Sequence, residues 1–135
     1  MNKTLAIIKP HATLSLHSGD IIRLIELNKF TIVRMIKTQL TRAQGEVFYA
    51  VHKAKPFFGE LVDNISSGPL IVMALEKDNA ITEWRELMGA TNPEKAAVGT
   101  IRKMFGKDIG SNAVHGSDAP ETAKIELEFF FPDLK

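Results

Sequence analysis

Two short runs of apolar residues, at positions 5–8 and 70–75, constrain the fold of this chain more than any other feature. Uninterrupted apolar runs of roughly four to eight residues are typical of strands that are buried on both faces of a sheet. Lys9-Pro10 ends the first run and Gly68-Pro69 precedes the second, at positions where regular structure is interrupted. We therefore expect a small sheet that is covered by helices.

The segments around these runs alternate between helix-like and strand-like patterns. Apolar residues on one face predict a helix over positions 21–27, capped by Ser18 or Asp20. The other expected elements are strands at 30–36 and 112–115 and helices at 41–49, 55–65, 79–88, 100–105 and 120–129, the first of these helices capped by Thr41. Most of the segment from 90 to 118 lacks a regular pattern, and long irregular segments in compact domains tend to carry function.

Length and composition limit the classes of protein to consider. The 135 residues predict one domain, 1–135, and 17 basic minus 16 acidic residues gives a net charge of +1. This balance argues against a membrane anchor or a nucleic-acid partner, so phosphate chemistry would depend on a few placed cations. The absence of cysteine excludes disulfides and thiolate chemistry. The N-terminus does not resemble a signal peptide, and we expect a cytoplasmic protein.

Several common motifs are missing from the sequence. It contains no G-x-x-x-x-G-K-[ST], no G-x-G-x-x-G after a strand and no protein-kinase H-R-D or D-F-G set. The four histidines stand apart at positions 11, 17, 52 and 115, without the spacing of a metal site. No metal site made of protein side chains alone is therefore expected, and His17 and His52 are interpreted as surface residues.

His115 has two interpretations. It ends a short apolar strand and precedes Gly116-Ser117-Asp118, so it could be a turn histidine that hydrogen-bonds the following helix cap. Alternatively, it is a nucleophile at the end of a strand, because neutral imidazole forms covalent intermediates near neutral pH. A nucleophile of this kind needs a group that orients its ring, and Ser117 and Glu126 are candidates.

A set of motifs favours the second interpretation. In order along the chain they are Lys9-Pro10, P-F-F at 56–58, S-G-P at 67–69, W-R-E-L-M-G-A-T-N-P at 84–93, G-T-I-R at 99–102 and G-S-N-A-V-H-G-S-D at 110–118. In this order and spacing the sequence resembles the nucleoside diphosphate kinases over essentially its whole length. The N-A-V-H-G-S-D segment carries the most specific part of the resemblance.

The resemblance implies a fold, a reaction and an assembly. The fold is an α+β sandwich of ferredoxin-like βαββαβ type, in which helices cover a four-stranded antiparallel sheet. The reaction moves the γ-phosphoryl group of a nucleoside triphosphate such as ATP to a nucleoside or deoxynucleoside diphosphate such as GDP. It is a ping-pong reaction through phosphohistidine that maintains nucleotide pools. Magnesium (Mg2+) held by the nucleotide phosphates is the implied cofactor, and the implied assembly is a homo-oligomer, a tetramer or a hexamer.

The resemblance also assigns roles to individual residues. His115 is the nucleophile, phosphorylated on Nδ1, and Ser117 and Glu126 hold it in position. The residues implied to contact phosphate and ribose are Lys9, Tyr49, Arg85, Thr91, Arg102 and Asn112. Phe57 and Leu61 would clamp the base, with Ile109 beside them. Stacking on Phe57 would tolerate any base, because every base has a π-face. Taken singly, these residues could equally be solvated charges, core aromatics or turn and cap residues.

The sequence departs from the family pattern at four positions. His11 stands where Asp is usual, Ser15 and Ser111 where Arg is frequent, and Met104 where an acidic residue is frequent. Along an extended strand His11 would share a face with Lys9. Protonated His11 would then strengthen nucleotide binding below about pH 6.5; the alternative is that His11 is only a surface substitution. The other three changes are expected to remove surface salt bridges of small energetic weight.

Two other functions are possible for this fold. An RNA-recognition module has the same βαββαβ order, but it needs aromatic residues on its central strands, and positions 32–36 and 70–75 have none. A catalytically silent nucleotide-binding scaffold is the second alternative. The retained His115, three cations and base clamp argue against it.

Overall fold

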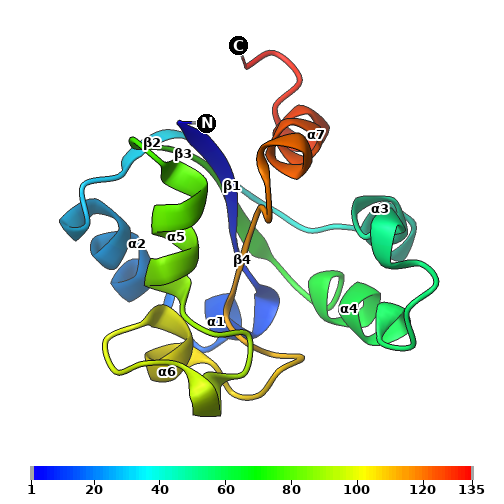
Figure 1. Cartoon of the computed structure of the whole chain (residues 1–135). Helices are drawn as coiled ribbons and strands as arrows, with labels where there is room; N and C mark the ends of the chain where they lie inside the picture. The colour runs from blue at the N-terminus through cyan, green and yellow to red at the C-terminus, as the bar shows by residue number, and fades with distance from the viewer. Residues whose placement is uncertain (1, 135) are drawn as a thin grey trace.

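The computed structural model describes residues 2–134 and contains one four-stranded antiparallel sheet. The strands β1 (Lys3–Ile8), β2 (Thr31–Thr38), β3 (Leu70–Glu76) and β4 (Val114–Gly116) lie in the order β2-β3-β1-β4. Both apolar runs form the central strands, and Figure 1 shows helices on both sides of the sheet. The predicted ferredoxin-like α+β fold is confirmed.

The helices occupy most of the expected positions. They are α1 (Pro10–Leu14), α2 (Ser18–Leu27), α3 (Arg42–Phe48), α4 (Phe58–Ile65), α5 (Ala80–Met88), α6 (Ile101–Phe105) and α7 (Pro120–Phe130), with 3-10 turns at Ala50–His52 and Pro93–Lys95. The sequence pattern did not predict α1 or the two 3-10 turns, which are three to five residues long.

Each face of the sheet has its own core. Ala6 and Ile8 of β1 point to one face and pack with buried residues of α2, α5 and α6. Leu5 and Ile7 point to the other face, where Leu127 of α7 and residues around α3 and α4 cover them. In Figure 1, α2 and α5 lie on one side of the sheet and α7 on the other. The central strands are therefore buried on both faces, as their composition predicts.

The helix caps agree only in part with expectation. Thr41 caps α3 as predicted, because its hydroxyl accepts the amide hydrogen of Gln44 and the Gln44 side chain accepts that of Thr41. The predicted cap of α2 by Ser18 or Asp20 is wrong. His17 occupies the cap position without a capping side-chain hydrogen bond, and its ring packs 4.8 Å from that of Phe105.

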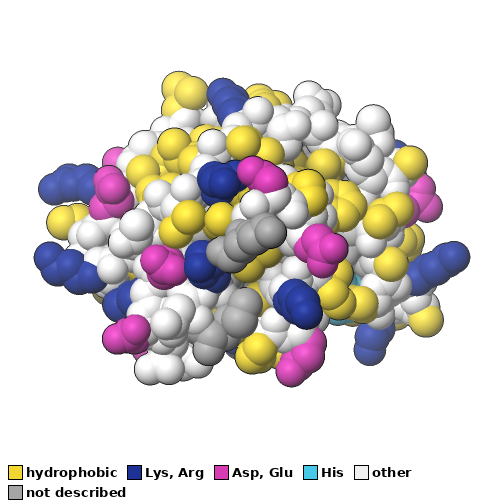
Figure 2. All heavy atoms as spheres, turned by 90° about the horizontal axis from the view of Figure 1, so that it is seen from above, with side chains coloured by type: hydrophobic (Ala, Val, Ile, Leu, Met, Phe, Trp, Pro, Cys, Tyr) yellow, Lys and Arg dark blue, Asp and Glu magenta, His cyan; other side chains and the backbone are white. Residues whose placement is uncertain are grey.

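The face of the molecule in Figure 2 shows no field of a single charge. On the face in Figure 2, lysine and arginine side chains alternate with aspartate and glutamate, in line with the net charge of +1. Among the helices in residues 2–134, none is both long and apolar enough to cross a membrane.

Candidate active site

A cavity of about 690 Å³ lies where the C-terminal end of β1, the strand β4 and the loops around α4, α5 and α6 meet. Ten of the twelve predicted site residues line it: Lys9, Tyr49, Phe57, Leu61, Arg85, Thr91, Arg102, Ile109, Asn112 and His115. The other two, Ser117 and Glu126, lie next to His115 but outside the lining. The fold thus brings together residues that span more than half of the sequence.

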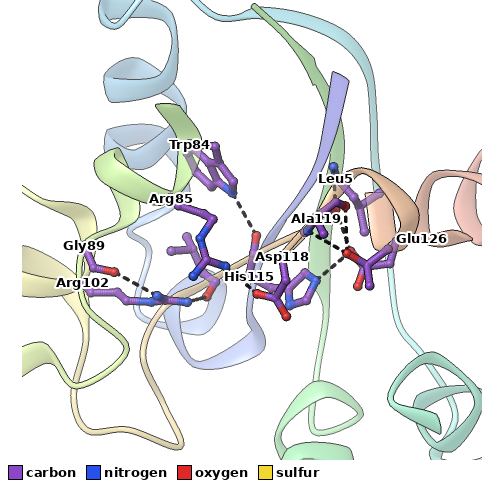
Figure 3. A network of polar contacts seen from close by, with 12 residues as sticks. Leu5, Trp84, Arg85, Gly89, Arg102, His115, Asp118, Ala119 and Glu126 are labelled. Carbon is purple, nitrogen blue, oxygen red and sulfur yellow. Dashed lines mark hydrogen bonds and ion pairs between the residues drawn. The ribbon is translucent and has the colours of Figure 1, made fainter. Parts of the chain in front are cut away.

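His115 is held through both its backbone and its ring. Its carbonyl oxygen accepts a hydrogen bond of 3.2 Å from Nε1 of Trp84, which ties β4 to α5. Its Nε2 atom lies 3.1 Å from Oε1 of Glu126 on α7 (Figure 3). Both side chains are about 15% exposed, so little water competes for this contact. With Nε2 engaged by a carboxylate, the lone pair of the neutral ring is on Nδ1.

A chain of hydrogen bonds fixes Glu126 in turn. Ser117 donates from its hydroxyl to the same Oε1 atom at 2.8 Å and accepts the amide hydrogen of Leu5 at 3.3 Å. Ser117 is fully buried. The carboxylate that orients His115 is therefore anchored to the central strand β1.

Two aromatic rings also contact the His115 imidazole. The Phe48 and Tyr49 rings approach it edge-on, with centroid distances of 5.2 and 6.1 Å. The sequence analysis missed Phe48, because an aromatic residue at the end of an amphipathic helix looks like ordinary core packing. Burial raises the pKa of the Tyr49 hydroxyl above its ordinary value, and the charge of Glu126 adds to the shift. The hydroxyl thus remains a hydrogen-bond donor at neutral pH.

Lys9 is buried at the wall of the cavity. Its Nζ atom donates to Oδ1 of Asn112 at 2.9 Å, and Asn112 donates to the carbonyl oxygen of Thr91 at 3.1 Å. Burial, with a further contribution from the positive charge of Arg102, lowers the pKa of Lys9 to about 7. An anion in the cavity would oppose this shift, because it favours the charged ammonium.

Arg102 is held by carbonyl oxygens instead of a carboxylate. Its guanidinium donates to the carbonyls of Gly89 and Val114, both at 3.0 Å, while its buried Nε has no partner among the described residues. Burial and the neighbouring charge of Arg85 lower the pKa of Arg102 to about 10. Arg85 pairs with Asp118 at 2.5 Å. Lys9, Arg85 and Arg102 thus line one cavity, and Figure 3 shows the two arginines with His115.

The opposite wall of the cavity is more apolar. Phe57 and Ile109 are 45% and 59% exposed, respectively, and Leu61 is half-buried beside them. His52 also lines the cavity, with its ring 5.9 Å from that of Phe57. The interpretation of His52 as a plain surface residue is therefore wrong. No motif marked it, since only the fold of the 3-10 turn brings it to the cavity.

The expectation for His11 is also wrong. The backbone is not extended there, because Pro10 and His11 begin α1, and His11 is not among the residues that line the cavity. Its Nε2 accepts the amide hydrogen of Ala113 at 2.7 Å. Burial, and then the charge of Lys9, lower the pKa of His11, so the neutral ring is favoured instead of a cation.

The other departures from the family pattern lie outside the cavity lining. Ser15 ends α1, Met104 is 47% exposed, and the amide of Ser111 donates to Asp108 at 2.8 Å. In the part of the chain that the structure describes, no three His, Asp or Glu side chains are grouped to hold a metal. Asp118 and Glu60 are the carboxylates that line the cavity.

The sequence is similar to known proteins along nearly its whole length. A sequence model described as nucleoside diphosphate kinase matches residues 2–135. Nucleoside diphosphate kinases of Oleidesulfovibrio alaskensis and Pelobacter propionicus are 54% and 53% identical to this chain. The matches cover 96% and 100% of this chain and 93% and 98% of those proteins.

Solved structures agree with these matches. The nucleoside diphosphate kinase of Aquifex aeolicus superposes with a TM-score of 0.94 at 40% identity, covering 96% of this chain and 94% of that one. The enzyme of Halobacterium salinarum, solved in complex with CDP, superposes with a TM-score of 0.93 at 35% identity, covering 98% and 90%.

Proposed function

This chain belongs to the nucleoside diphosphate kinase family of phosphotransferases, and we propose that it works through a phosphorylated His115. The observation that carries the proposal is the contact between Nε2 of His115 and Glu126, which leaves Nδ1 as the nucleophilic atom in a cavity that Lys9, Arg85 and Arg102 also line. The substrates are nucleoside triphosphates such as ATP as donors and nucleoside diphosphates such as GDP as acceptors. The reaction maintains nucleoside and deoxynucleoside triphosphate pools.

The reaction proceeds in two half-reactions. The Nδ1 lone pair of His115 attacks the γ-phosphorus of the triphosphate, and the bond from this phosphorus to the β,γ-bridging oxygen breaks. The diphosphate leaves with that electron pair. A terminal oxygen of the incoming diphosphate then attacks the phosphorus, and the N–P bond breaks with its electrons returning to Nδ1. Glu126 keeps the proton on Nε2 and balances the charge that the ring gains in each half-reaction.

The cationic side chains would act by holding the phosphates in place and neutralising their charge. Phosphoryl transfer is catalysed mainly by alignment and by neutralisation of phosphate charge. Lys9, Arg85 and Arg102 supply this charge from separate elements, while Asn112 and Thr91 extend the network toward the ribose. The buried Tyr49 hydroxyl remains protonated and can donate to a phosphate oxygen. Phe57, Leu61 and Ile109 hold the base by stacking and packing, which requires no particular base.

The proposed magnesium ion would be held by the nucleotide phosphates. Mg²⁺ is usually bound through one or two carboxylates together with substrate phosphates and water. Asp118 and Glu60 provide carboxylates at the cavity, and this set fits an ion carried by phosphates. When bound, the ion would neutralise phosphate charge and orient the γ-phosphoryl group. We further propose that the chain acts in the cytoplasm as a homo-oligomer, a tetramer or a hexamer.

The alternatives are less well supported. An RNA-recognition module stacks bases on an open sheet face, whereas helices cover both faces of this sheet. A silent scaffold would need no oriented histidine, yet Glu126 and Ser117 are placed to orient His115.

The test is an intact-mass spectrum at alkaline pH after brief incubation with ATP and magnesium. We expect one added phosphoryl group that disappears when GDP is supplied. His115→Ala should lack it, while the matched control His17→Ala, outside the cavity lining, should retain it. Binding of ATP without any added phosphoryl group would favour the silent scaffold.

A further inference from the structure

Ala113 lies between the site residues Asn112 and His115 and has a strained backbone conformation. It stands between Asn112 and the strand β4 that carries His115, and its φ of 75° lies in the left-handed region that residues other than glycine rarely adopt. Ala113 is fully buried. Such a conformation persists only where surrounding contacts hold it.

Two hydrogen bonds from one short segment hold Ala113. Its carbonyl oxygen accepts the amide hydrogen of Lys9 at 2.8 Å, and its own amide hydrogen is donated to Nε2 of His11 at 2.7 Å. The first bond is between backbone atoms. The second depends on the side chain of His11, so it depends on the protonation state of that ring.

The first turn of α1 directs the His11 ring toward Ala113. Pro10 starts the helix after an extended Lys9, and the amide of Ser15 donates to the carbonyl of His11 at 3.1 Å. The ring is half-buried behind the strained residue and does not line the cavity. His11 can therefore affect the site through Ala113 without touching the nucleotide.

Only the neutral ring can make this contact. To accept at Nε2, His11 must carry its single proton on Nδ1, whereas an imidazolium ring has donors at both nitrogens and would face the amide hydrogen with another donor. The charged or titratable groups that face the ring are Lys9 from the start of α1, His17 from the start of α2, and Lys107 with Asp108 from the loop before β4. Lys9, Lys107 and His17 disfavour the cation, and Asp108 alone opposes them.

We propose that neutral His11 is a positioning residue that holds Ala113, and through it Asn112 and His115, in the geometry for phosphoryl transfer. Protonation of His11 breaks this contact and makes the site acid-sensitive. The catalytic part of this inference rests on the proposed function, whereas the contact itself does not. Burial and the charge of Lys9 lower the pKa of His11 below the ordinary imidazole value of about 6.5. We therefore expect the hydrogen bond between Ala113 and His11 to be lost only below that pH.

The contact can be measured without turnover. In ¹⁵N-labelled, nucleotide-free protein, an N–H···N bond transmits a scalar coupling between the amide nitrogen of Ala113 and Nε2 of His11. We expect this coupling at pH 8 and its disappearance as the His11 ring is protonated. A spectrum at pH 8 without the coupling, or a coupling that survives protonation of His11, overturns the proposal.

The consequence is measured as the single-turnover rate of His115 phosphorylation against pH. Wild type should lose rate as the pH falls and the His11 ring is protonated. His11→Gln retains an acceptor of similar reach that does not titrate, so it should be active at pH 8 and lose less rate than wild type as the pH falls. His11→Leu removes the acceptor and should be about 10- to 100-fold slower at pH 8.

Two outcomes contradict the positioning role. These are identical pH profiles for wild type and His11→Gln, or full activity of His11→Leu at pH 8. Failure of every variant to become phosphorylated would instead refute the phosphohistidine route. In that case the coupling between Ala113 and His11 still decides whether the contact exists.

Discussion

Glu126 on α7 places Oε1 3.1 Å from Nε2 of His115 on β4, and the same oxygen accepts the Ser117 hydroxyl at 2.8 Å. One carboxylate thus sets both the orientation of the ring and its tautomer. Glu126→Gln keeps the size of the side chain but removes the charge that would balance the His115 ring in the proposed transfer.

We expect Glu126→Gln to slow His115 phosphorylation roughly 10²-fold, in the range typical for loss of one charge-stabilising group. Rapid-quench single-turnover kinetics with ATP measure this rate. Ser117→Ala should have a smaller effect, because Glu126 keeps its contact with His115. Equal rates for wild type and Glu126→Gln would show that the carboxylate has no part in the step.

Nucleotide binding should add a proton to Lys9. With a pKa of about 7 in the empty site, Lys9 is mostly neutral at pH 8, and bound phosphates favour its charged form. Net uptake of up to about one proton per ADP is therefore expected at pH 8. Calorimetry in buffers of different ionisation enthalpy measures the uptake. Lys9→Met should lose it, and an unchanged uptake in that variant would contradict the assignment.

Tyr49 is the only tyrosine in the chain, so its ionisation can be followed by ultraviolet absorbance. Burial raises its pKa, so the folded protein should show no tyrosinate at pH values near 10, where free tyrosine ionises. Because the folded pKa is raised, stability from Tyr49 is present below about pH 10 and is lost as the pH rises further. Tyr49→Phe should remove this component of alkaline unfolding. Tyrosinate in protein that is still folded near pH 10 would contradict the prediction.

The indole of Trp84 holds β4, the strand that carries His115. Trp84→Phe removes the donor to the His115 carbonyl and should lower the free energy of unfolding by about 1–3 kcal/mol, measured by denaturant titration. Gly116→Ala should also destabilise the fold, because a Cβ there would overlap the Trp84 indole and lie 2.6 Å from Cε of Met88. Gly19→Ala is the matched control, since a Cβ at Gly19 meets nothing within 4 Å.

Much of the architecture was predictable because its causes are local. The uninterrupted apolar runs form the central strands β1 and β3. Thr41 and Gln44 cap the start of α3 by hydrogen bonds between residues only three positions apart. The family motifs predicted twelve site residues, and ten of them, His115 included, line one cavity. These signals are carried by residue type and spacing, which a sequence displays directly.

The tertiary structure decided what depends on packing between distant segments. It placed His52 and Phe48 at the site, and it turned His11 from an expected cation near the phosphates into an acceptor for the amide of Ala113. Burial in the tertiary structure, together with the charge of Arg102, lowers the pKa of Lys9 to about 7. Arg102 lies 93 positions later in the chain, so the sequence around Lys9 does not show this effect. Burial and hydrogen-bond partners arise only when the segments meet, so no local pattern in the sequence could express them.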